Sequence, residues 1–277
     1  MTAPIPYHRL ARTDRHRWWR PLAGSLVILF GLPLTLTGLF GAAHAVAGPI
    51  ELRFDDSITG FAVTMVTLAM LTPLSMLAAW WVQRRPPGTL SSVAGRLRKN
   101  RLLGYLLLAA SVVGLATGVQ LWLSGESPEL ASTEIGFLVV LVLLVPLQAA
   151  GEEYLFRGWM LQAFGSWFRS PWPGIVVSSL LFGLAHGLGS PLAMADVTLF
   201  GVVTAVLTIR TGGLEAAIAL HVANNLAGFA LASEGEPDTT TYLISMVMVL
   251  VYAVAVLATP KNRDRISEVV DNLVDAF

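Results

Sequence analysis

Three short stretches of the sequence hold most of the ionisable side chains that occur within its apolar runs. They read GEEYLFRG from residue 151, LLFGLAHGLG from residue 180 and ALHVANNLAG from residue 219. Carboxylate, imidazole and amide groups of this kind can activate a water molecule, orient it and stabilise an oxyanion. An ionised side chain at the middle of a membrane costs about 2.5 to 3.5 kcal/mol on insertion scales, so such groups indicate a functional site.

The acidic stretch has a geometry that follows from helix periodicity. Residues four apart share one face of a helix, so Glu153 is predicted to pair with Arg157. Glu152 is rotated by about 100° and is predicted to face a cavity. The spacing therefore predicts one carboxylate held by an ion pair and a second one available for chemistry. The simpler interpretation is an ion pair at a helix end, with side chains that reach the interface.

Each histidine has a companion one helical turn away. Phe182 precedes His186 by four residues, and its ring could exclude water or line a substrate pocket. Asn225 follows His221 by four residues, and its amide could orient the ring or donate a hydrogen bond to an oxyanion. Taken singly, His186 is more often a packing hydrogen-bond donor, and His221 with Asn225 can join helices without any chemistry.

Taken in order, the three stretches resemble the motifs of one protein family. EEYLFR fits E-E-x-x-x-R, FGLAH fits F-x-x-x-H and HVANN fits H-x-x-x-N, with 29 residues from Arg157 to His186 and 35 from His186 to His221. Each motif alone is weak, but the ordered set is specific. The chain is similar to the CPBP family of membrane-embedded proteases, which includes the type II CAAX prenyl endopeptidases and the bacterial Abi and bacteriocin-processing proteins. The resemblance covers about residues 135–232.

The resemblance implies hydrolysis of a peptide bond inside the membrane. Glu152 would act as the general base on a water molecule that His186 helps to position. His221 and Asn225 would donate hydrogen bonds to the tetrahedral oxyanion, a role worth about 2.7 to 4 kcal/mol per donor in soluble proteases. The site would be formed by the fourth, fifth and seventh apolar segments and would be reached from the cytoplasmic side.

Glu153 and Arg157 would hold the helix end and tune Glu152. A metal site is left open, because Glu152, His186 and His221 could be three ligands of a zinc ion with a fourth position for water. In that case the general base would be another group, such as Glu153. No H-E-x-x-H motif occurs in the sequence, and we favour water activated by glutamate without a metal.

The composition defines the elements that must position these residues. Of the 277 residues, 55% are hydrophobic and 13% are charged, and the mean hydropathy is +0.66. These values indicate an integral membrane protein and argue against nucleic-acid binding. The absence of cysteine excludes a disulfide framework, a thiolate nucleophile and a Cys-ligated metal.

Eight apolar segments approach the roughly 20 helical residues that cross a hydrocarbon core. Unpaired backbone groups are not tolerated in lipid, and no segment alternates with period two, so we predict an all-α bundle of about eight membrane-spanning helices. The predicted spans are 22–47, 58–82, 102–123, 135–153, 173–190, 192–211, 213–232 and 240–259.

We predict a basic N-terminal arm at residues 1–21, a single transmembrane domain at residues 22–259 and a tail at residues 260–277 with an amphipathic helical pattern. Basic residues gather in the arm and in the loop after the second span, which predicts that both lie in the cytoplasm and that both termini do. They are Arg9, Arg12, Arg15, Arg17, Arg20, Arg84, Arg85, Arg96, Arg98, Lys99 and Arg101. The expected location is the cell membrane.

The depths of two predicted site residues conflict with simple crossings. Glu152 lies near the inner end of its span, whereas His186 follows about 13 residues after its own span begins there, so their depths would differ by about 10 Å. We therefore predict that residues 154–168 remain in the inner interface as a helix beside the site.

Charged residues near the ends of spans are interpreted as hydrated and without a role in the site. They are His44, Asp196 and Arg210, of which Asp196 alone could instead approach a cavity. The expected partners are a membrane-associated peptide or protein substrate and the lipid bilayer. Two other classes compete with a protease: a non-catalytic scaffold, chaperone or immunity protein that uses the same pocket, and a transporter of protons or small solutes. Transporters often contain repeated halves, and the sequence shows no internal repeat.

Overall fold

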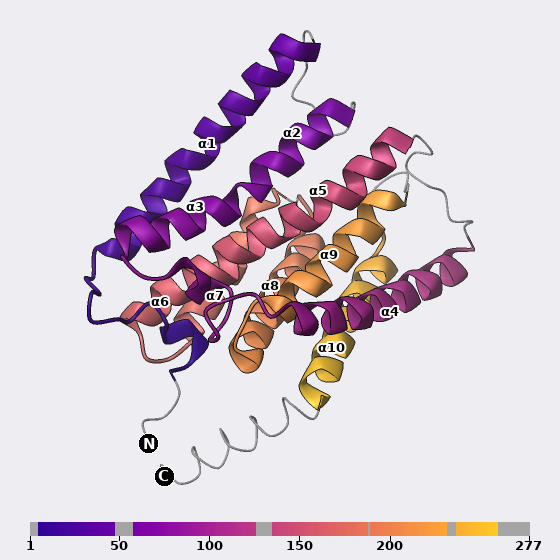
Figure 1. Cartoon of the computed structure of the whole chain (residues 1–277). Coiled ribbons are helices and arrows are strands. Elements are labelled where there is room, and N and C mark those ends of the chain that lie inside the picture. Colours follow the sequence, from indigo (N-terminus) through magenta and orange to yellow (C-terminus); the bar gives the residue numbers. More distant parts are fainter. Residues whose placement is uncertain (1–4, 48–57, 126–134, 188, 232–236, 260–277) are drawn as a thin grey trace.

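The computed structural model describes residues 5–47, 58–125, 135–187, 189–231 and 237–259 (Figure 1). The amphipathic helix predicted at residues 260–277 lies outside these ranges. Within them no β-strand forms beyond one isolated bridge, which confirms the predicted all-α class. The α-helices are α1 (Arg20–Ala47), α2 (Ile58–Ala69), α3 (Leu71–Leu77), α4 (Lys99–Ser124), α5 (Ile135–Glu153), α6 (Leu161–Trp167), α7 (Trp172–Ala185), α8 (Pro191–Thr211), α9 (Glu215–Ala230) and α10 (Thr239–Ala258). Shorter turns are η1 (Tyr7–Arg9), η2 (Ala78–Val82), η3 (Pro87–Leu90) and η4 (Tyr154–Met160).

Six helical stretches in the described part of the chain are long and apolar enough to cross a membrane. They are Arg20–Val46, Ile58–Val82, Lys99–Ser124, Ile135–Trp167, Pro191–Thr211 and Thr239–Ala258. The fifth and seventh predicted spans instead form the shorter helices α7, with 14 residues, and α9, with 16 residues. At 1.5 Å per residue α7 is about 21 Å long, less than a hydrocarbon core of roughly 30 Å. The exact number of crossings therefore stays a prediction.

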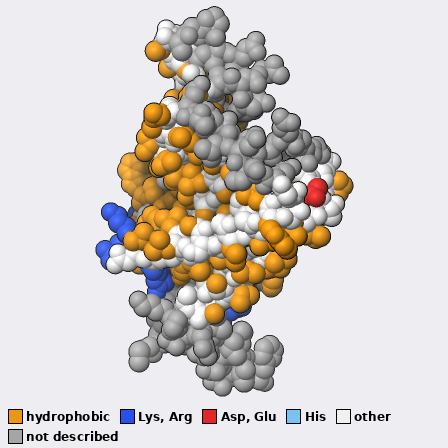
Figure 2. Space-filling view, turned by 90° about the vertical axis from the view of Figure 1, so that its right-hand side faces the viewer, with side chains coloured by type: hydrophobic (Ala, Val, Ile, Leu, Met, Phe, Trp, Pro, Cys, Tyr) orange, Lys and Arg blue, Asp and Glu red, His pale blue; other side chains and the backbone are white. Residues whose placement is uncertain are grey.

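The outer surface of the bundle is apolar. Large side chains such as Leu34 on α1 and Trp122 on α4 are 75% and 78% exposed. Figure 2 shows many apolar side chains across the middle of the visible face, with Lys and Arg toward its left and lower edge. A soluble protein rarely exposes a contiguous apolar surface of this extent. The composition, the long apolar helices and this surface define a multi-pass membrane protein.

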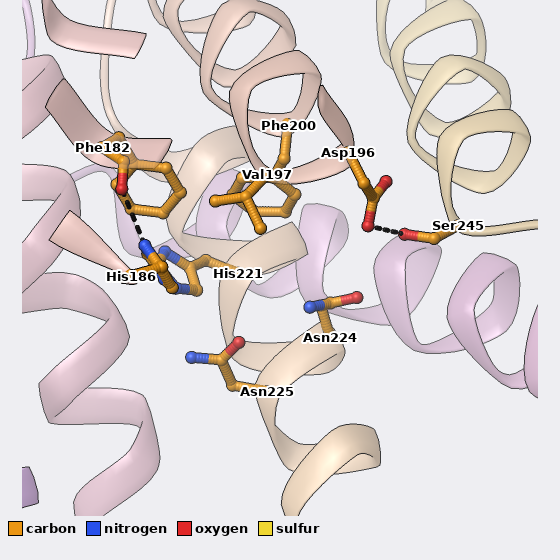
Figure 3. A pocket seen from close by; sticks show the side chains of 9 residues that line it. All are labelled: Phe182, His186, Asp196, Val197, Phe200, His221, Asn224, Asn225 and Ser245. Carbon is orange, nitrogen blue, oxygen red and sulfur yellow. Dashed lines mark hydrogen bonds between the residues drawn. The ribbon is translucent and has the colours of Figure 1, made fainter. Parts of the chain in front are cut away.

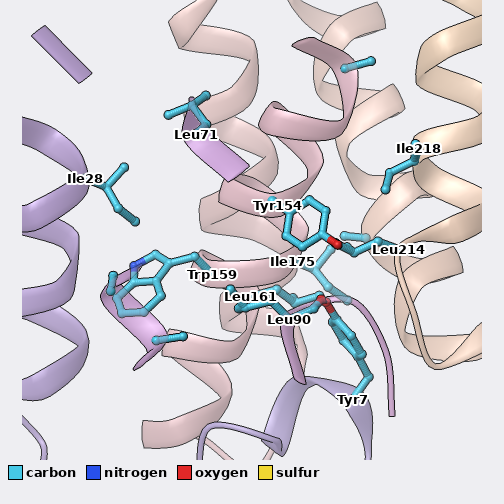
Figure 4. Close-up of a cluster of buried hydrophobic side chains, with 14 of the residues drawn as sticks. Tyr7, Ile28, Leu71, Leu90, Tyr154, Trp159, Leu161, Ile175, Leu214 and Ile218 are labelled. Carbon is cyan, nitrogen blue, oxygen red and sulfur yellow. The ribbon is translucent and has the colours of Figure 1, made fainter. Parts of the chain in front are cut away.

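Helix α9 occupies the interior of the bundle, where it packs against α4, α5 and α8 (Figure 1). Its first eight residues, Glu215–Val222, are all buried. A second buried layer surrounds the end of α5, where Tyr154 lies beside Leu214, just before α9 in the chain, and Trp159 lies toward Ile28 of α1 (Figure 4). The buried start of α9 and this second layer meet at the junction of α5, η4 and α9. Their packing fixes the positions of the residues that could do chemistry.

The chain continues as a helix through residues 154–167. A π-helical turn, η4, joins α5 directly to α6, and most side chains of both are buried. The predicted helix beside the site is therefore confirmed, although it extends α5 and is not a separate element. Its placement in the membrane interface stays a prediction. π-Helical turns inside α-helices are frequent at functional sites, and this one begins directly after Glu153.

Gly151 allows α5 and α2 to approach closely next to the acidic residues. A Cβ atom built on Gly151 would lie 2.3 Å from the carbonyl oxygen of Leu68, a backbone atom that cannot move alone. We expect Gly151→Ala to lower the free energy of unfolding by about 1–3 kcal/mol, as overpacked cores do. SDS titration followed by tryptophan fluorescence measures this change.

The matched control is Gly118→Ala on α4, where an added Cβ meets nothing within 4 Å. Alanine favours a helix over glycine by about 0.8–1.0 kcal/mol, so this variant should be as stable as the wild type or more stable. Equal effects of the two substitutions would contradict the close approach of α5 and α2.

The N-terminal segment packs on the end of α6. The Tyr7 hydroxyl donates to the carbonyl of Leu90, and the His8 ring Nε2 donates to the carbonyl of Arg169 at 3.0 Å. Arg9 donates to the carbonyl of Phe168, just after α6, at 2.7 Å. Arg12 donates to the carbonyl of Ser166, at the end of α6, at 2.9 Å. The basic arm is therefore bound to the bundle from Tyr7 onward.

Acidification should loosen this segment. Burial lowers the pKa of His8 below its ordinary value of 6.5, and its buried Nδ1 has no hydrogen-bond partner in the described residues. The undocked segment binds a proton more tightly, so docking is fully favourable above pH 6.5 and weakens as the pH falls below it. Hydrogen exchange of residues 7–12, corrected for intrinsic rates, should rise between pH 7.5 and 5.5. His8→Gln keeps a donor without a titratable ring, and a pH effect of unchanged size in this variant would exclude His8 as the cause.

Candidate active site

His221 lies between the two carboxylates of the acidic stretch. Its Nδ1 is 2.8 Å from Glu153 Oε1, and its Nε2 is 3.4 Å from Glu152 Oε2. All three side chains are buried, with Glu153 at 0% exposure and Glu152 at 8%. The carboxylates thus contact opposite nitrogens of one imidazole ring. This arrangement can hold the ring at Nδ1 and exchange a proton between Nε2 and Glu152.

Arg157 supports Glu153 from the following turn. Its NH1 donates to Glu153 Oε1 at 3.0 Å, which is the contact that the four-residue spacing predicts. The guanidinium is fully buried and lies 4.2 Å from the centre of the Phe182 ring. Cations bind aromatic faces at such distances. A single carboxylate oxygen therefore joins Arg157 to His221.

Glu152 differs in part from its predicted position. It is the more accessible carboxylate, as predicted, but it contacts His221 and is not among the residues that line the adjacent pocket. The physical reason is that α9 packs against the end of α5, so that residues on two different faces of α5 both contact His221. The prediction that Glu152 faces a cavity on its own is therefore corrected.

His221 also lines a pocket, whose other residues are drawn in Figure 3. The pocket has a cavity volume of about 60 Å³, and a water molecule needs roughly 10–15 Å³, so several can enter. The lining residues are Phe182, His186, Asp196, Val197, Phe200, His221, Asn224, Asn225 and Ser245. They come from α7, α8, α9 and α10. The prediction that three spans form the site is therefore incomplete, because α8 and α10 contribute as well.

His186 and Phe182 both line this pocket, although their surroundings differ. His186 is exposed at the end of α7, and its Nδ1 donates to the Phe182 carbonyl at 2.7 Å. This bond leaves Nε2 as the acceptor of a neutral ring. Phe182 is buried and packs on both histidine rings, with centroid distances of 4.6 Å to His186 and 5.8 Å to His221. It separates Arg157 from the pocket.

Asn225 reaches the site with a partner that the sequence reasoning missed. Its Nδ2 donates to Gln148 Oε1 at 3.1 Å, and Gln148 lies one turn before Glu152 on α5. The sequence does contain a signal for Gln148. It is the only amide side chain in the apolar segment 135–153, and it is four residues from Glu152. The same reasoning did not place Asn224 or Ser245 in the pocket wall, and it gave Asp196 only as a residue that could approach a cavity.

The residues do not form the metal site that the sequence left open. Within the described ranges, no three His, Asp or Glu side chains are grouped so that they could hold a metal ion. Glu152 and His221 contact each other, but His186 stands at the end of α7 and is bound to a backbone carbonyl. The set of Glu152, His186 and His221 therefore does not fit a zinc ion in this arrangement.

The fold and the buried Glu–His–Glu cluster define a class of protein, a helical membrane protein with a polar site inside its bundle. The model of the type II CAAX prenyl endopeptidase Rce1-like family matches residues 134–227, which include all three motifs. The resemblance to the CPBP family is thus confirmed, and it supports an intramembrane protease at the level of the family.

Two curated proteins are similar to the chain. The uncharacterized protein YyaK of Bacillus subtilis (strain 168) is 27% identical over 186 residues, which are 64% of this chain and 62% of that protein. An uncharacterized 24.3 kDa protein of Escherichia coli is 40% identical over 87 residues, which are 31% of this chain and 39% of that protein. The chain thus matches less than two thirds of the length of either relative. No solved structure matches the chain significantly.

Proposed function

We propose that the chain is an intramembrane endopeptidase that hydrolyses a peptide bond with a water molecule activated by Glu152. The observation that carries this proposal is the contact of two buried carboxylates with opposite nitrogens of His221, beside a pocket large enough for water. A carboxylate next to an imidazole in a site of low dielectric constant is suited to general acid–base catalysis.

Glu152 takes the proton of the water molecule as the water oxygen bonds to the carbonyl carbon of the substrate. The proton then passes to the amide nitrogen as the C–N bond breaks, which restores the carboxylate. His221 contacts Glu153 through Nδ1, and when it is protonated at both nitrogens it also pairs with Glu152 through Nε2, 3.4 Å away. We assign His221 this positioning role in preference to oxyanion binding because its Nε2 already faces a carboxylate.

Asn225 is the proposed donor to the oxyanion. One N–H of its amide is bound to Gln148, and the second is free for the substrate oxygen, because an Asn side chain has two N–H donors. Removal of one oxyanion donor typically lowers kcat by 10²–10³-fold. His186, at the end of α7, is proposed to contact the substrate or its water through Nε2.

The positive-inside rule supports cytoplasmic termini and a site reached from that side of the cell membrane. Under this orientation α9 begins at the inner face with Glu215, and His221 follows six residues later. At 1.5 Å per residue the ring lies about 9 Å inside the bundle. The substrate is then a membrane-associated peptide or protein segment that enters from the inner leaflet.

Cleavage of a peptide library by the purified protein in nanodiscs tests the proposal. The wild type and His221→Ala are compared, each with and without a chelator. Turnover that is lost in His221→Ala and unchanged by the chelator supports the glutamate mechanism. Turnover that the chelator abolishes would contradict it in favour of a metal. No turnover by folded wild type would favour a non-catalytic scaffold with the same pocket.

A further inference from the structure

Asp196 places a carboxylate in the pocket wall. It lies on α8, and its Oδ2 accepts a hydrogen bond from the Ser245 hydroxyl on α10 at 3.0 Å. Its Oδ1 is buried and has no hydrogen-bond partner among the described residues. Of the two interpretations of Asp196, a hydrated span end and an approach to a cavity, the structure agrees with the second. A buried polar atom without a partner costs about 1–3 kcal/mol, and more when it is charged.

No basic side chain of the described residues forms an ion pair with Asp196. The polar groups that share its pocket are two imidazoles, two amides and the Ser245 hydroxyl, and the rest of the lining is apolar. The two buried arginines of the described residues have other partners, since Arg157 pairs with Glu153 and Arg85 donates to Gln162. Within the described residues no side chain therefore donates to Asp196 Oδ1, which can accept a hydrogen bond from a bound molecule.

The position of Asp196 relates it to the proposed reacting atoms. In Figure 3 Asp196 and Ser245 lie at the opposite end of the pocket from His186, and Asn224 lies between them and Asn225. A substrate carbonyl held at Asn225 would direct a neighbouring side chain toward Asp196. The same pocket therefore has a reacting end and an acidic end.

We propose that Asp196, with Ser245 and Asn224, forms an acidic subsite that binds a lysine or arginine side chain of the peptide substrate beside the scissile bond. This inference rests on the proposed function, because it names the substrate class of that site. A cation satisfies Oδ1 directly, and charge-assisted hydrogen bonds are about twice as strong as neutral ones. A neutral side chain of similar length leaves Oδ1 unpaired, and an acidic one is repelled.

Binding to the inactive Glu152→Gln protein in nanodiscs tests the subsite without requiring turnover. The probes are three libraries of fluorescent, acetylated and amidated decapeptides with apolar and glycine positions and one fixed residue, which is lysine, norleucine or glutamate. We expect the lysine library to bind at least tenfold more tightly than the norleucine library, and the glutamate library to bind most weakly. In the double variant Glu152→Gln with Asp196→Asn, the lysine library should bind less than twofold more tightly than the norleucine library.

Ser245→Ala leaves the carboxylate in place without its hydrogen bond and should reduce the preference about threefold. Asp14→Asn, an exposed carboxylate on the N-terminal arm, is the matched control and should change nothing. Equal binding of lysine and norleucine libraries, binding of none of the three, or a preference that survives Asp196→Asn would overturn the subsite. A preference that depends on Asp196 in a protein whose wild type cleaves nothing would keep the subsite and reject the protease function.

Discussion

Glu152→Gln is expected to lower kcat/KM for peptide cleavage by about 10²–10⁴-fold, the usual contribution of a general acid–base group. The amide has nearly the shape of the carboxylate, but it cannot take a proton from water. Because Glu152 is the more accessible of the two carboxylates that contact His221, its replacement removes the base and leaves the ion pair of Glu153 with Arg157 intact. The measurement is the initial rate of cleavage in nanodiscs.

The control for this variant is Asp14→Asn, which makes the same chemical change at an exposed position. It should keep the rate of the wild type, and both variants should unfold at the same SDS concentration as the wild type. If Glu152→Gln retained more than a tenth of the wild-type rate, the general base would have to be another residue, and Glu153 would be the next candidate.

Glu153→Ala is expected to destabilise the protein by about 3–5 kcal/mol, since removing one partner of a buried ion pair leaves the other charge uncompensated. Arg157 is fully buried, and its Nε and NH2 already lack hydrogen-bond partners in the described part of the chain. The Phe182 ring at 4.2 Å offsets only part of this cost. SDS titration monitored by tryptophan fluorescence reports the change.

The double variant Glu153→Ala with Arg157→Leu separates stability from catalysis. Both buried charges are gone, and replacement of a buried ion pair by apolar side chains is often neutral, so most of the stability should return. Cleavage should be lost in both the single and the double variant, because His221 no longer has a carboxylate at Nδ1. Arg210→Ala on the exposed face of α8 should be neutral. A double variant that is as unstable as Glu153→Ala would show that the charge of Arg157 is not the source of the loss.

The pairing of Glu153 with Arg157 could be predicted because both residues lie on one helix. A four-residue separation fixes their relative position whatever surrounds them, and the structure places them 3.0 Å apart. The all-α class was likewise determined by the sequence, because apolar segments without period-two alternation can satisfy their backbone groups in lipid only as helices. The motifs also singled out His186, His221 and Asn225, and the structure brings all three to one pocket.

Contacts between helices could not be predicted in this way. That Glu152 and Glu153 both contact His221 depends on the rotation of α5 against α9, and this rotation follows from packing, including the close approach of Gly151 to the backbone of Leu68. The partner of Asn225 and the place of Asp196 in the pocket wall have the same origin. Helix periodicity acts along one chain segment, so the sequence determined which groups are present and which share a helix face. Only side-chain packing between segments decided which of them meet around His221.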